Sequence, residues 1–453
     1  MNRVFKTART LCATILAVAI LLAGCGSKSS TGGNVVNINP AALLASIEQK
    51  TDTALADWDW TSFIINFGNL LINFSNTIDM QKVTYQSNGA DGNVHSMTGL
   101  LILPKAIIGG KPSVPILMYQ HGTEVYRPFS PSQYLAHQDR PRDYPEVMVA
   151  AAIAATGYAV ALVDYEGMGD NTDSQPHVVG AILAQQVIDL LKASRDIIAR
   201  SNSPCTWNNQ LFLMGYSEGG YVTMAVTREL QLHPVAGFTV TASAPLSGPH
   251  DLSGVQRGVI LSGSTFKAPY FVPMLLTSYN YAYGTPTMTD FSPGFAMLPP
   301  FNSTLPPLFD GNSQSVTISK EMGMSFDNPV TLIVPNIILT PEFMIQLNDD
   351  TSAVVATFLK QNDSYRDPQS ANATWVPTVP IRMIHHPNDE LVPYGNSQAA
   401  FNAFKAASAA STVELIAETA IVNIPSGSVK TVHYGSAFPE LIDGWNWLNG
   451  FKN

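Results

Sequence analysis

The stretch LFLMGYSEGGYVTMAV, residues 211–226, decides the fold of this 453-residue chain. A strand-like apolar run leads into Gly215-Tyr216-Ser217-Glu218-Gly219, after which the spacing of apolar residues becomes helical. A G-x-S-x-G sequence between strand and helix indicates a turn in which a side chain at either glycine would collide, and it presents the serine at the sheet edge. The following helix adds backbone N–H groups and the positive end of its dipole. We therefore predict that Ser217 is a nucleophile.

The segments around this turn alternate between strand and helix patterns. Residues 82–104 predict a hairpin, because two β-type runs flank the turn-rich NGADGNVH. Strand-like and helix-like runs then follow in the order 113–120, 144–157, 158–165, 178–200 and 210–215. Such alternation is typical of a mostly parallel sheet with helices on both faces. The predicted fold class is therefore α/β.

The alternation is lost in residues 251–375, which are rich in Pro, Phe, Tyr, Met and Asn, and it resumes at VPIRMIHH. We predict that this stretch is a cap or lid inserted into one core, which is made of residues 56–250 and 376–453. The cap is expected to cover the carboxyl edge of the sheet. A terminal amphipathic helix is expected to pack on the sheet through Phe438, Leu441, Ile442, Trp445 and Leu448.

The beginning of the chain predicts a targeting signal. A positively charged region precedes a short apolar run, which ends in Leu22-Ala23-Gly24-Cys25 and resembles the lipobox of bacterial lipoproteins. The resemblance implies that residues 1–24 are removed and that acylated Cys25 holds the protein on a membrane of the bacterial cell envelope. Gly26 favours the outer membrane. An ordinary cleaved signal with an incidental cysteine is the alternative.

The rest of the chain is a globular sequence with few charges, since 45% of residues are hydrophobic and 13% charged. Removing residues 1–24, which hold three positive charges and no acid, takes the formal charge from −10 to −13. With no Lys or Arg run, nucleic acid is not an expected partner. Residues 25–55 are predicted to be a flexible tether. Cys205 is left without a disulfide partner and is expected to be a packed small residue.

A serine hydroxyl needs a base to accept its proton and an acid to orient that base. Asp389 stands in PIRMIHHPNDELVP, where an apolar strand ends and a loop begins, and Glu390 is the alternative acid. His433 is the histidine that follows this acid, as the chain order of α/β-hydrolases requires. A second motif, G-x-S-x-A around Ser397, has no strand running directly into it, and we predict that Ser397 caps a helix.

An oxyanion hole needs two backbone donors. We expect one to be the N–H of Glu218 and the other to come from LMYQHGTEV, with Thr123 as the first choice and Gly122 as the second. His121 in this loop is expected to pack or to hydrogen-bond locally. The sequence has no Cys/His ligand cluster, and neither a metal nor a cofactor is expected.

Several segments together resemble the secretory lipase and related esterase branch of the α/β-hydrolase superfamily. They are PILMYQHGT, GYAVALVDYEGMGDNTDSQPHVVG leading into VIDLLKASRDI, LMGYSEGGYVTMAVTREL, SAPLSGPHDLSG, HHPNDELVP and VHYGSAF. The resemblance implies an α/β-hydrolase fold and a carboxylic ester hydrolase that forms an acyl-enzyme, with Ser217 as nucleophile, Asp389 as acid and His433 as base. The chain departs from the family at His386, where glycine is more usual.

The apolar, aromatic centres of the cap favour a small ester or lipid substrate, and we expect a monomer. Two alternatives stay open. One is a serine peptidase of the same fold that acts on short peptides, for which Asp310 and Glu321 are the candidate groups to hold a substrate amino terminus. The other is a non-catalytic ligand-binding lipoprotein, against which an intact Ser/Asp/His set argues.

Overall fold

The computed structural model describes residues 31–48, 60–72, 76–284, 290–327, 331–349, 353–407, 412–420 and 431–453. The predicted signal and Cys25 lie outside these ranges. The strands of the main sheet are β1 (Thr31–Gly32), β2 (Val36–Ile38), β3 (Asn76–Asn88), β4 (Val94–Ala106), β5 (Ser113–Gln120), β6 (Ala159–Val163), β7 (Thr206–Tyr216), β8 (Val240–Leu246), β11 (Ile381–His385) and β12 (Val413–Ala417). The helices around it are α2 (Pro40–Glu48), α3 (Trp60–Phe63), α4 (Asn69–Ile72), α5 (Pro145–Ala155), α6 (Gly180–Ile198), α7 (Glu218–Leu232), α15 (Gly395–Ala406) and α16 (Val432–Asn449).

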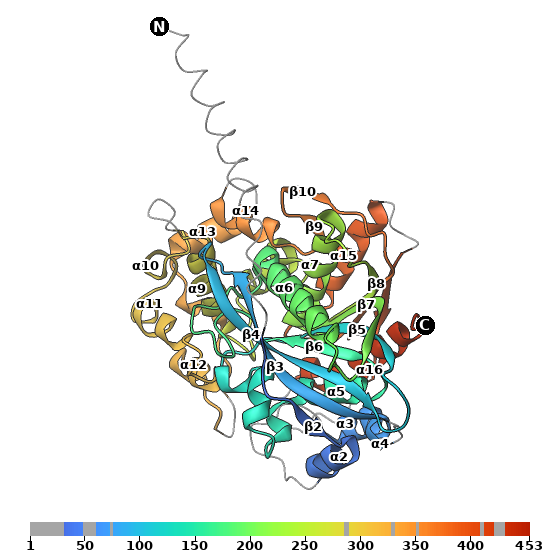
Figure 1. The fold of residues 1–453 in the computed structure, drawn as a ribbon. Coiled ribbons are helices and arrows are strands. Elements are labelled where there is room, and N and C mark those ends of the chain that lie inside the picture. Colours follow the sequence, from blue (N-terminus) through green and yellow to red (C-terminus); the bar gives the residue numbers. More distant parts are fainter. Residues whose placement is uncertain are drawn as a thin grey trace.

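The strands form one sheet in the order β1-β3-β4-β6-β5-β7-β8-β11-β12, with β2 also paired to β3 (Figure 1). Neighbouring strands run parallel from β6 to β12, whereas β3, β4 and β6 pair in antiparallel fashion. This is the mostly parallel α/β sheet that the sequence predicts. The expected hairpin, the strands at 113–120 and 158–165, and the helices at 144–157 and 178–200 are all present within a few residues of their predicted bounds.

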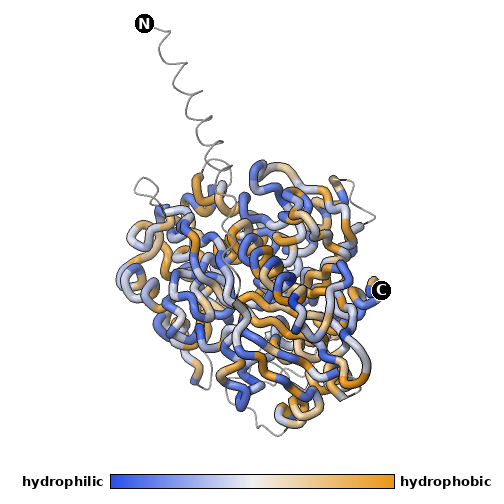
Figure 2. The backbone as a smooth tube through the Cα atoms, in the orientation of Figure 1, coloured by the Kyte–Doolittle hydropathy of each residue, from blue (hydrophilic) through white to orange (hydrophobic). Residues whose placement is uncertain are grey.

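Helices cover both faces of the sheet because its central strands are apolar on both sides. On β5, Ile116 and Met118 belong to the buried cluster under α6 and α7, while Leu117 and Tyr119 belong to the cluster under α5 and α16. Figure 2 shows the hydrophobic stretches concentrated along these central strands. The terminal helix α16 packs its Phe438, Leu441 and Leu448 into the second cluster, as predicted.

Residues 31–48 correct the prediction of a flexible tether. The strands β1 and β2 pair antiparallel with β3, and α2 buries Leu43, Leu44 and Ile47. The alternation of apolar and polar residues in NVVNIN suits a strand at the edge of a sheet. By pairing with β3, the strands β1 and β2 satisfy backbone groups that this edge would otherwise leave unpaired. The composition of the segment obscured this pattern, since Ser, Gly and Asn are also the residues of linkers.

The described part of residues 251–375 forms a mainly helical unit between β8 and β11, seen beside the sheet in Figure 1. Its named elements are α8 (Arg257–Leu261), α9 (Phe271–Tyr283), α10 (Pro293–Ala296), α11 (Phe301–Thr304), α12 (Ser315–Glu321), α13 (Pro341–Asn348), α14 (Val354–Gln361), β9 (Arg366–Asp367) and β10 (Ser370–Thr374). We call residues 251–375 the cap. Its apolar side chains, Tyr279 and Phe291 among them, join the same buried cluster as the α6/α7 face, so the cap and this face share one core.

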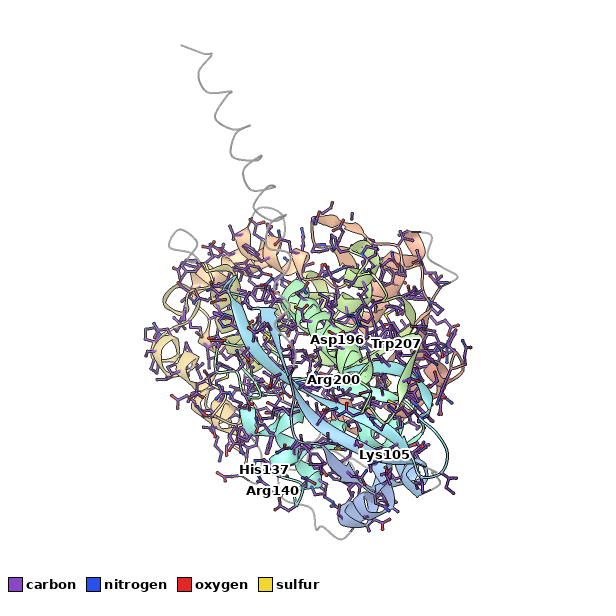
Figure 3. All side chains as sticks on the ribbon, viewed as in Figure 1. Lys105, His137, Arg140, Asp196, Arg200 and Trp207 are labelled. Carbon is purple, nitrogen blue, oxygen red and sulfur yellow. The ribbon has the colours of Figure 1, made fainter. Side chains whose placement is uncertain are left out.

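Some charged side chains lie on the outside of the fold, whereas others, Glu440 and Arg228 among them, are buried. Figure 3 labels Lys105, Asp196 and Arg200, all of which are exposed. None of the helices within the described ranges combines the length and the apolar character that crossing a bilayer requires.

Candidate active site

Ser217 occupies a strained turn between β7 and α7. Its φ is 61° and its ψ −125°, a conformation that non-glycine residues rarely adopt. The flanking glycines are required by space: a Cβ at Gly219 would lie 1.9 Å from the Gln120 carbonyl oxygen, and a Cβ at Gly215 2.5 Å from the same atom. Ser217 therefore lies in a tight strand-to-helix turn, directly before the first residue of α7, and its role as nucleophile stays a prediction.

Asp389 and His433 form the expected acid and base pair. Asp389 lies in the loop after β11, and its Oδ2 accepts a hydrogen bond from His433 Nδ1 at 2.5 Å. Burial on its own raises the pKa of the Asp389 carboxyl, but the charges and hydrogen bonds of His433 and His385 outweigh it and hold the pKa well below its usual range. Asp389 is therefore an ionised acceptor that fixes the orientation of the His433 ring.

His433, the predicted base, lies in the first turn of the last helix. His433 is the second residue of α16, whose amino terminus Thr431 caps by accepting the N–H of Tyr434. Tyr216, next to the nucleophile, donates its hydroxyl hydrogen to the His433 carbonyl, and the two rings lie 4.9 Å apart between centroids. The residue before Ser217 thus packs directly against His433.

The predicted oxyanion loop borders the pocket of Ser217, and it corrects the expectation for Gly122. Thr123, Ser217 and Glu218 line the same pocket, and among the described residues no acceptor pairs with the backbone N–H of Thr123. The N–H of Gly122 instead donates to both carboxyl oxygens of Glu146, at 3.1 and 3.2 Å. Gly122 is therefore wrong as an oxyanion donor, because its N–H is already used.

Glu218 has a side-chain role that the sequence did not suggest. Its Oε1 lies 2.8 Å from His177 Nδ1 and accepts the N–H of Val178 at 3.3 Å. Burial raises the pKa of this carboxyl, but the charge and hydrogen bond of His177 lower the pKa by more than burial raises it. The net pKa is therefore below the ordinary value. The residue after the nucleophile is therefore a buried carboxylate paired with the pocket wall.

The pocket in front of Ser217 is mostly apolar. It has a volume of about 650 Å³, counting the space at its mouth. The cap supplies much of its wall, through Val259, Ile260, Phe266, Phe271, Val272, Leu275 and Pro335. His177 also lines it and stacks on Phe271 of α9, with 6.1 Å between ring centroids. A smaller cavity of about 280 Å³ lies deeper in the cap, and Ile260, Val272 and Leu275 line both.

The alternative acid and the loop histidine have other partners. Glu390 accepts the N–H of Val432 and pairs with Lys267 of the cap at 3.0 Å, so it supports the start of α16 and does not contact the base. His121 packs on the Tyr165 ring and binds the Gly122 carbonyl, as expected of a local role. Asp389 is thus the acid of the pair.

Ser397 and Cys205 complete the predicted residues. Ser397 is wrong as a helix cap: α15 begins at Gly395 after Tyr394, and no side chain caps it. Its hydroxyl lies 2.8 Å from His385 Nδ1 instead. Cys205 is fully buried, and this burial raises the pKa of its thiol to about 11. It behaves as a packed small residue, as predicted.

Sequence reasoning missed Glu146, Glu440 and His177. Glu440 of α16 is fully buried and accepts the Ser247 hydroxyl at 2.7 Å and the His386 N–H at 3.0 Å. It therefore ties the base-bearing helix to the acid-bearing loop. A glutamate inside a predicted apolar helix face was the available signal, because an acid there is buried and needs partners.

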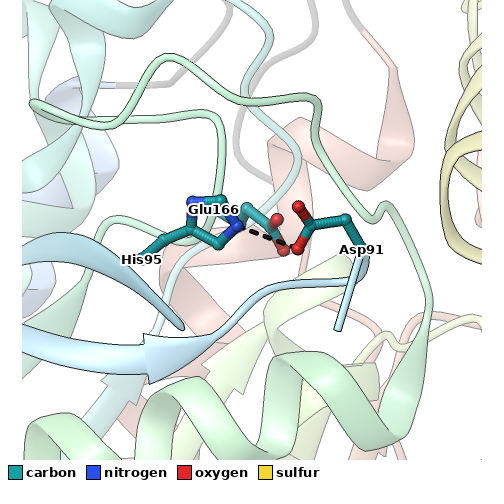
Figure 4. A group of neighbouring side chains, drawn as sticks. All are labelled: Asp91, His95 and Glu166. Carbon is teal, nitrogen blue, oxygen red and sulfur yellow. Dashed lines mark hydrogen bonds and ion pairs between the residues drawn. The ribbon is translucent and has the colours of Figure 1, made fainter. Parts of the chain in front are cut away.

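A mixed cluster of Asp91, His95 and Glu166 lies at the β3–β4 turn (Figure 4). Both His95 nitrogens already face carboxylates, Asp91 at 2.8 Å and Asp173 at 2.9 Å. Glu166 accepts the hydroxyl of Tyr281 in α9 at 2.7 Å. The hydrogen bond to Asp91 raises the pKa of His95. The cluster is an ion-pair network that fastens the cap to the hairpin.

No known family profile matches the chain, and no curated protein matches its sequence. Solved structures do match it. A Legionella pneumophila protein named as a hydrolase is 21% identical with a TM-score of 0.71, covering 93% of this chain and 98% of its own. The rice cell wall degrading esterase LipA from Xanthomonas oryzae is also 21% identical with a TM-score of 0.71, covering 94% and 99%.

Lipase A of Candida antarctica matches more distantly, at 16% identity and a TM-score of 0.54 over 78% of this chain and 74% of its own. Likeness at these identities establishes the fold. The chain has the α/β-hydrolase fold of these esterases and lipases, as the resemblance in its sequence predicts.

Proposed function

We propose that this chain, an α/β-hydrolase in fold, hydrolyses carboxylic esters through a covalent acyl-enzyme. The observation that carries the proposal is the Asp389–His433 hydrogen bond packed against the strained Ser217 turn. An ionised acid, an oriented imidazole and a hydroxyl that lines the pocket are the parts that nucleophilic acyl transfer requires.

The reaction follows from these parts. His433 accepts the proton of Ser217 Oγ as this oxygen attacks the ester carbonyl, and the backbone N–H groups of Thr123 and Glu218 stabilise the negative oxygen of the tetrahedral intermediate. His433 then gives the proton to the leaving alcohol. Water, activated by the same histidine, attacks the acyl-enzyme and releases the carboxylic acid, which restores Ser217.

The pocket favours an apolar acyl group over a peptide. Among the described residues that line the pocket, Glu218 is the one with a carboxylate, and this carboxylate is already paired with His177. Asp310 and Glu321, the candidates to hold a substrate amino terminus, are exposed on the cap and do not line the pocket. An apolar chain loses no hydrogen bonds on entering such a cavity and gains about 0.8 kcal/mol per buried methylene.

The test is hydrolysis of p-nitrophenyl esters, from acetate to palmitate, by a protein that begins at residue 26, beside Ser217→Ala. We expect wild-type turnover and a loss of at least about a thousandfold in the variant. Asp389→Asn is expected to lower kcat strongly with little change in KM. A folded wild-type protein that hydrolyses none of these esters overturns the proposal and directs the search to peptides, and then to ligand binding without catalysis.

We further propose that the mature protein is anchored to a membrane of the bacterial cell envelope through acylated Cys25, with its catalytic unit in solution. The lipobox-like Leu22-Ala23-Gly24-Cys25 supports this. Labelled palmitate should enter the wild-type protein and not Cys25→Ser, and the variant should leave the membrane fraction. Equal labelling of both proteins would contradict the anchor.

A further inference from the structure

The carboxylate of Asp389 accepts hydrogen bonds from three groups and has a fourth polar neighbour, His385, within ion-pair distance. Its Oδ1 takes the N–H groups of Leu391 at 2.9 Å and Val392 at 2.8 Å. Its Oδ2 faces His433 Nδ1 at 2.5 Å and, on another side, His385 Nε2 at 3.3 Å. A carboxylate offers about four lone-pair sites, so this set fills them. Asp389 therefore has a second histidine that the transfer of the serine proton does not use.

His385 is held rigidly by its own partners. Its Nε2 lies 2.7 Å from the Val392 carbonyl oxygen, and its Nδ1 lies 2.8 Å from the hydroxyl of Ser397. A carbonyl oxygen can only accept, so Nε2 carries a hydrogen, which it donates to Val392 while Asp389 Oδ2 lies 3.3 Å away. In the neutral ring Nδ1 is then the acceptor, and the Ser397 hydroxyl donates to it. Ser397 thereby selects the tautomer that faces the acid.

The fold brings these residues together from two elements. His385 is the last residue of β11, at the point where the acid loop begins, and Ser397 stands in the first turn of α15 directly after that loop. Both side chains are completely buried, so water does not compete for their hydrogen bonds. The G-x-S-x-A sequence around Ser397 thus has a use that is tied to the acid rather than to a second nucleophile.

We propose that His385 is a positioning residue for Asp389 and that Ser397 fixes its tautomer, so that a relay of Ser397, His385, Asp389 and His433 orients the base. This inference rests on the proposed ester hydrolysis. Neither His385 nor Ser397 lines the substrate pocket. The effect of the relay is therefore expected on turnover and on pH dependence rather than on substrate binding.

The expected pH effect follows from the donors of Asp389. Asp389 and His433 share a short hydrogen bond. Removing the His385 donor leaves the carboxylate less stabilised, so the pair binds a proton more tightly and the acid limb of kcat/KM moves to higher pH. The other titratable groups around His385 are its neighbour His386, Tyr394 just before α15 and His250 after β8. Burial, with a smaller effect of His385, lowers the pKa of His250 to about 3, so this ring is uncharged in the range tested.

The experiment compares His385→Phe, Ser397→Ala and Ser397→Thr by steady-state ester hydrolysis from about pH 4 to about pH 9, with thermal unfolding of each protein. We expect His385→Phe to lower kcat about tenfold, to leave KM within about twofold and to raise the midpoint of the acid limb by about half to one pH unit. Ser397→Ala should move both quantities in the same direction by less. Ser397→Thr, which keeps the hydroxyl, should restore them.

His233→Phe is the matched control, because His233 also pairs with a carboxylate four residues away, Glu229 at 2.8 Å, but on the surface. It should leave kcat and the acid limb unchanged. If His385→Phe does not fold, Ser397→Ala against Ser397→Thr decides the question. Wild-type activity that depends on Ser217, together with an unchanged acid limb in the folded variants, overturns this inference alone. A folded wild-type protein without esterase activity overturns the proposed function and this inference with it.

Discussion

Glu218, the residue that follows the nucleophile, forms a buried pair with His177 of the pocket wall, with 2.8 Å between Oε1 and Nδ1. His177→Phe keeps an aromatic ring against Phe271 but leaves a buried carboxylate with the N–H of Val178 as its remaining donor. We expect the free energy of unfolding to fall by about 3 kcal/mol, as when one partner of a buried ion pair is removed. Urea unfolding measures it. Adding Glu218→Gln should recover most of the loss, and a single variant as stable as the wild type would contradict the pairing.

Glu146 predicts a fall in activity at alkaline pH. Burial raises the pKa of its carboxyl to about 8, and the hydrogen bond from Gly122 only partly offsets this. A Cβ at Gly122 would lie 3.6 Å from Ser217 Cβ and 3.8 Å from Glu146 Oε2, so the carboxyl and the nucleophile flank one glycine. Above about pH 8 the new negative charge opposes the oxyanion, and kcat/KM should decline.

Glu146→Gln keeps an acceptor for Gly122 and should remove this alkaline decline. Glu229→Gln, a surface change, should retain it. The measurement is the pH profile of ester hydrolysis for the three proteins. An alkaline limb that persists in Glu146→Gln would assign the decline to another group.

Glu440 predicts a pH-dependent stability. Burial raises its pKa well above the usual range, and the hydrogen bond from Ser247 offsets only part of this. The folded state therefore holds a proton that the unfolded state releases above about pH 4.5, so the contribution of this group to stability is complete below that pH and declines as pH rises towards the folded pKa.

Relative to the wild type, Glu440→Gln should gain unfolding free energy by up to about 1.4 kcal/mol for each pH unit between about pH 5 and pH 8. Urea unfolding at several pH values gives this difference, with the exposed Glu321→Gln as the control. A difference that does not change with pH would mean that Glu440 is charged in the fold.

Gly219 tests the nucleophile turn. A Cβ there would meet the Gln120 carbonyl oxygen at 1.9 Å, so Gly219→Ala must displace the backbone of β5 or of the turn. We expect the loss of esterase activity and of about 3 kcal/mol or more of unfolding free energy. Gly258→Ala in α8 is the matched control, because a Cβ there meets nothing within 4 Å and alanine favours a helix. Equal stability of the two variants would contradict the close approach.

Leu275 predicts the chain-length preference. Its side chain lies between the pocket at Ser217 and the deeper cavity of the cap. Leu275→Trp should exclude about three methylenes of a long acyl chain, which at about 0.8 kcal/mol each lowers kcat/KM for a decanoate ester roughly fiftyfold while sparing acetate. Ile345→Trp on α13, where the native side chain is 71% exposed, is the control. An equal loss for both esters would place the acyl chain elsewhere.

The sequence predicted best what depends on local pattern. Two glycines between a strand pattern and a helix pattern predict the turn at Ser217. The chain order of α/β-hydrolases then indicates Asp389 and His433. The partners of these residues could not be predicted in this way. His177, Glu146 and Glu440 reach the site from other elements, and which buried acid meets which donor depends on packing between segments far apart in the chain.

Two errors have physical causes. The edge strands at residues 31–38 are short and lie in a linker-like composition, so their pairing with β3 becomes visible only when the edge of the sheet is known. A glycine at position 122 lets the backbone approach the substrate, but the N–H of Gly122 donates to Glu146 instead. The local sequence determines whether a backbone N–H has room to approach a substrate. Tertiary contacts determine whether that N–H is still free to donate a hydrogen bond.

The cap lies between β8 and β11, which are adjacent and parallel. Two parallel neighbours cannot be joined by a tight turn, and the chain must travel from one end of the sheet to the other before it can re-enter. Residues 251–375 provide this crossover connection, and they also form much of the pocket wall. An engineer who wished to open the site could therefore not simply excise them: a replacement crossover of a dozen residues or more would have to carry the chain back to the start of β11.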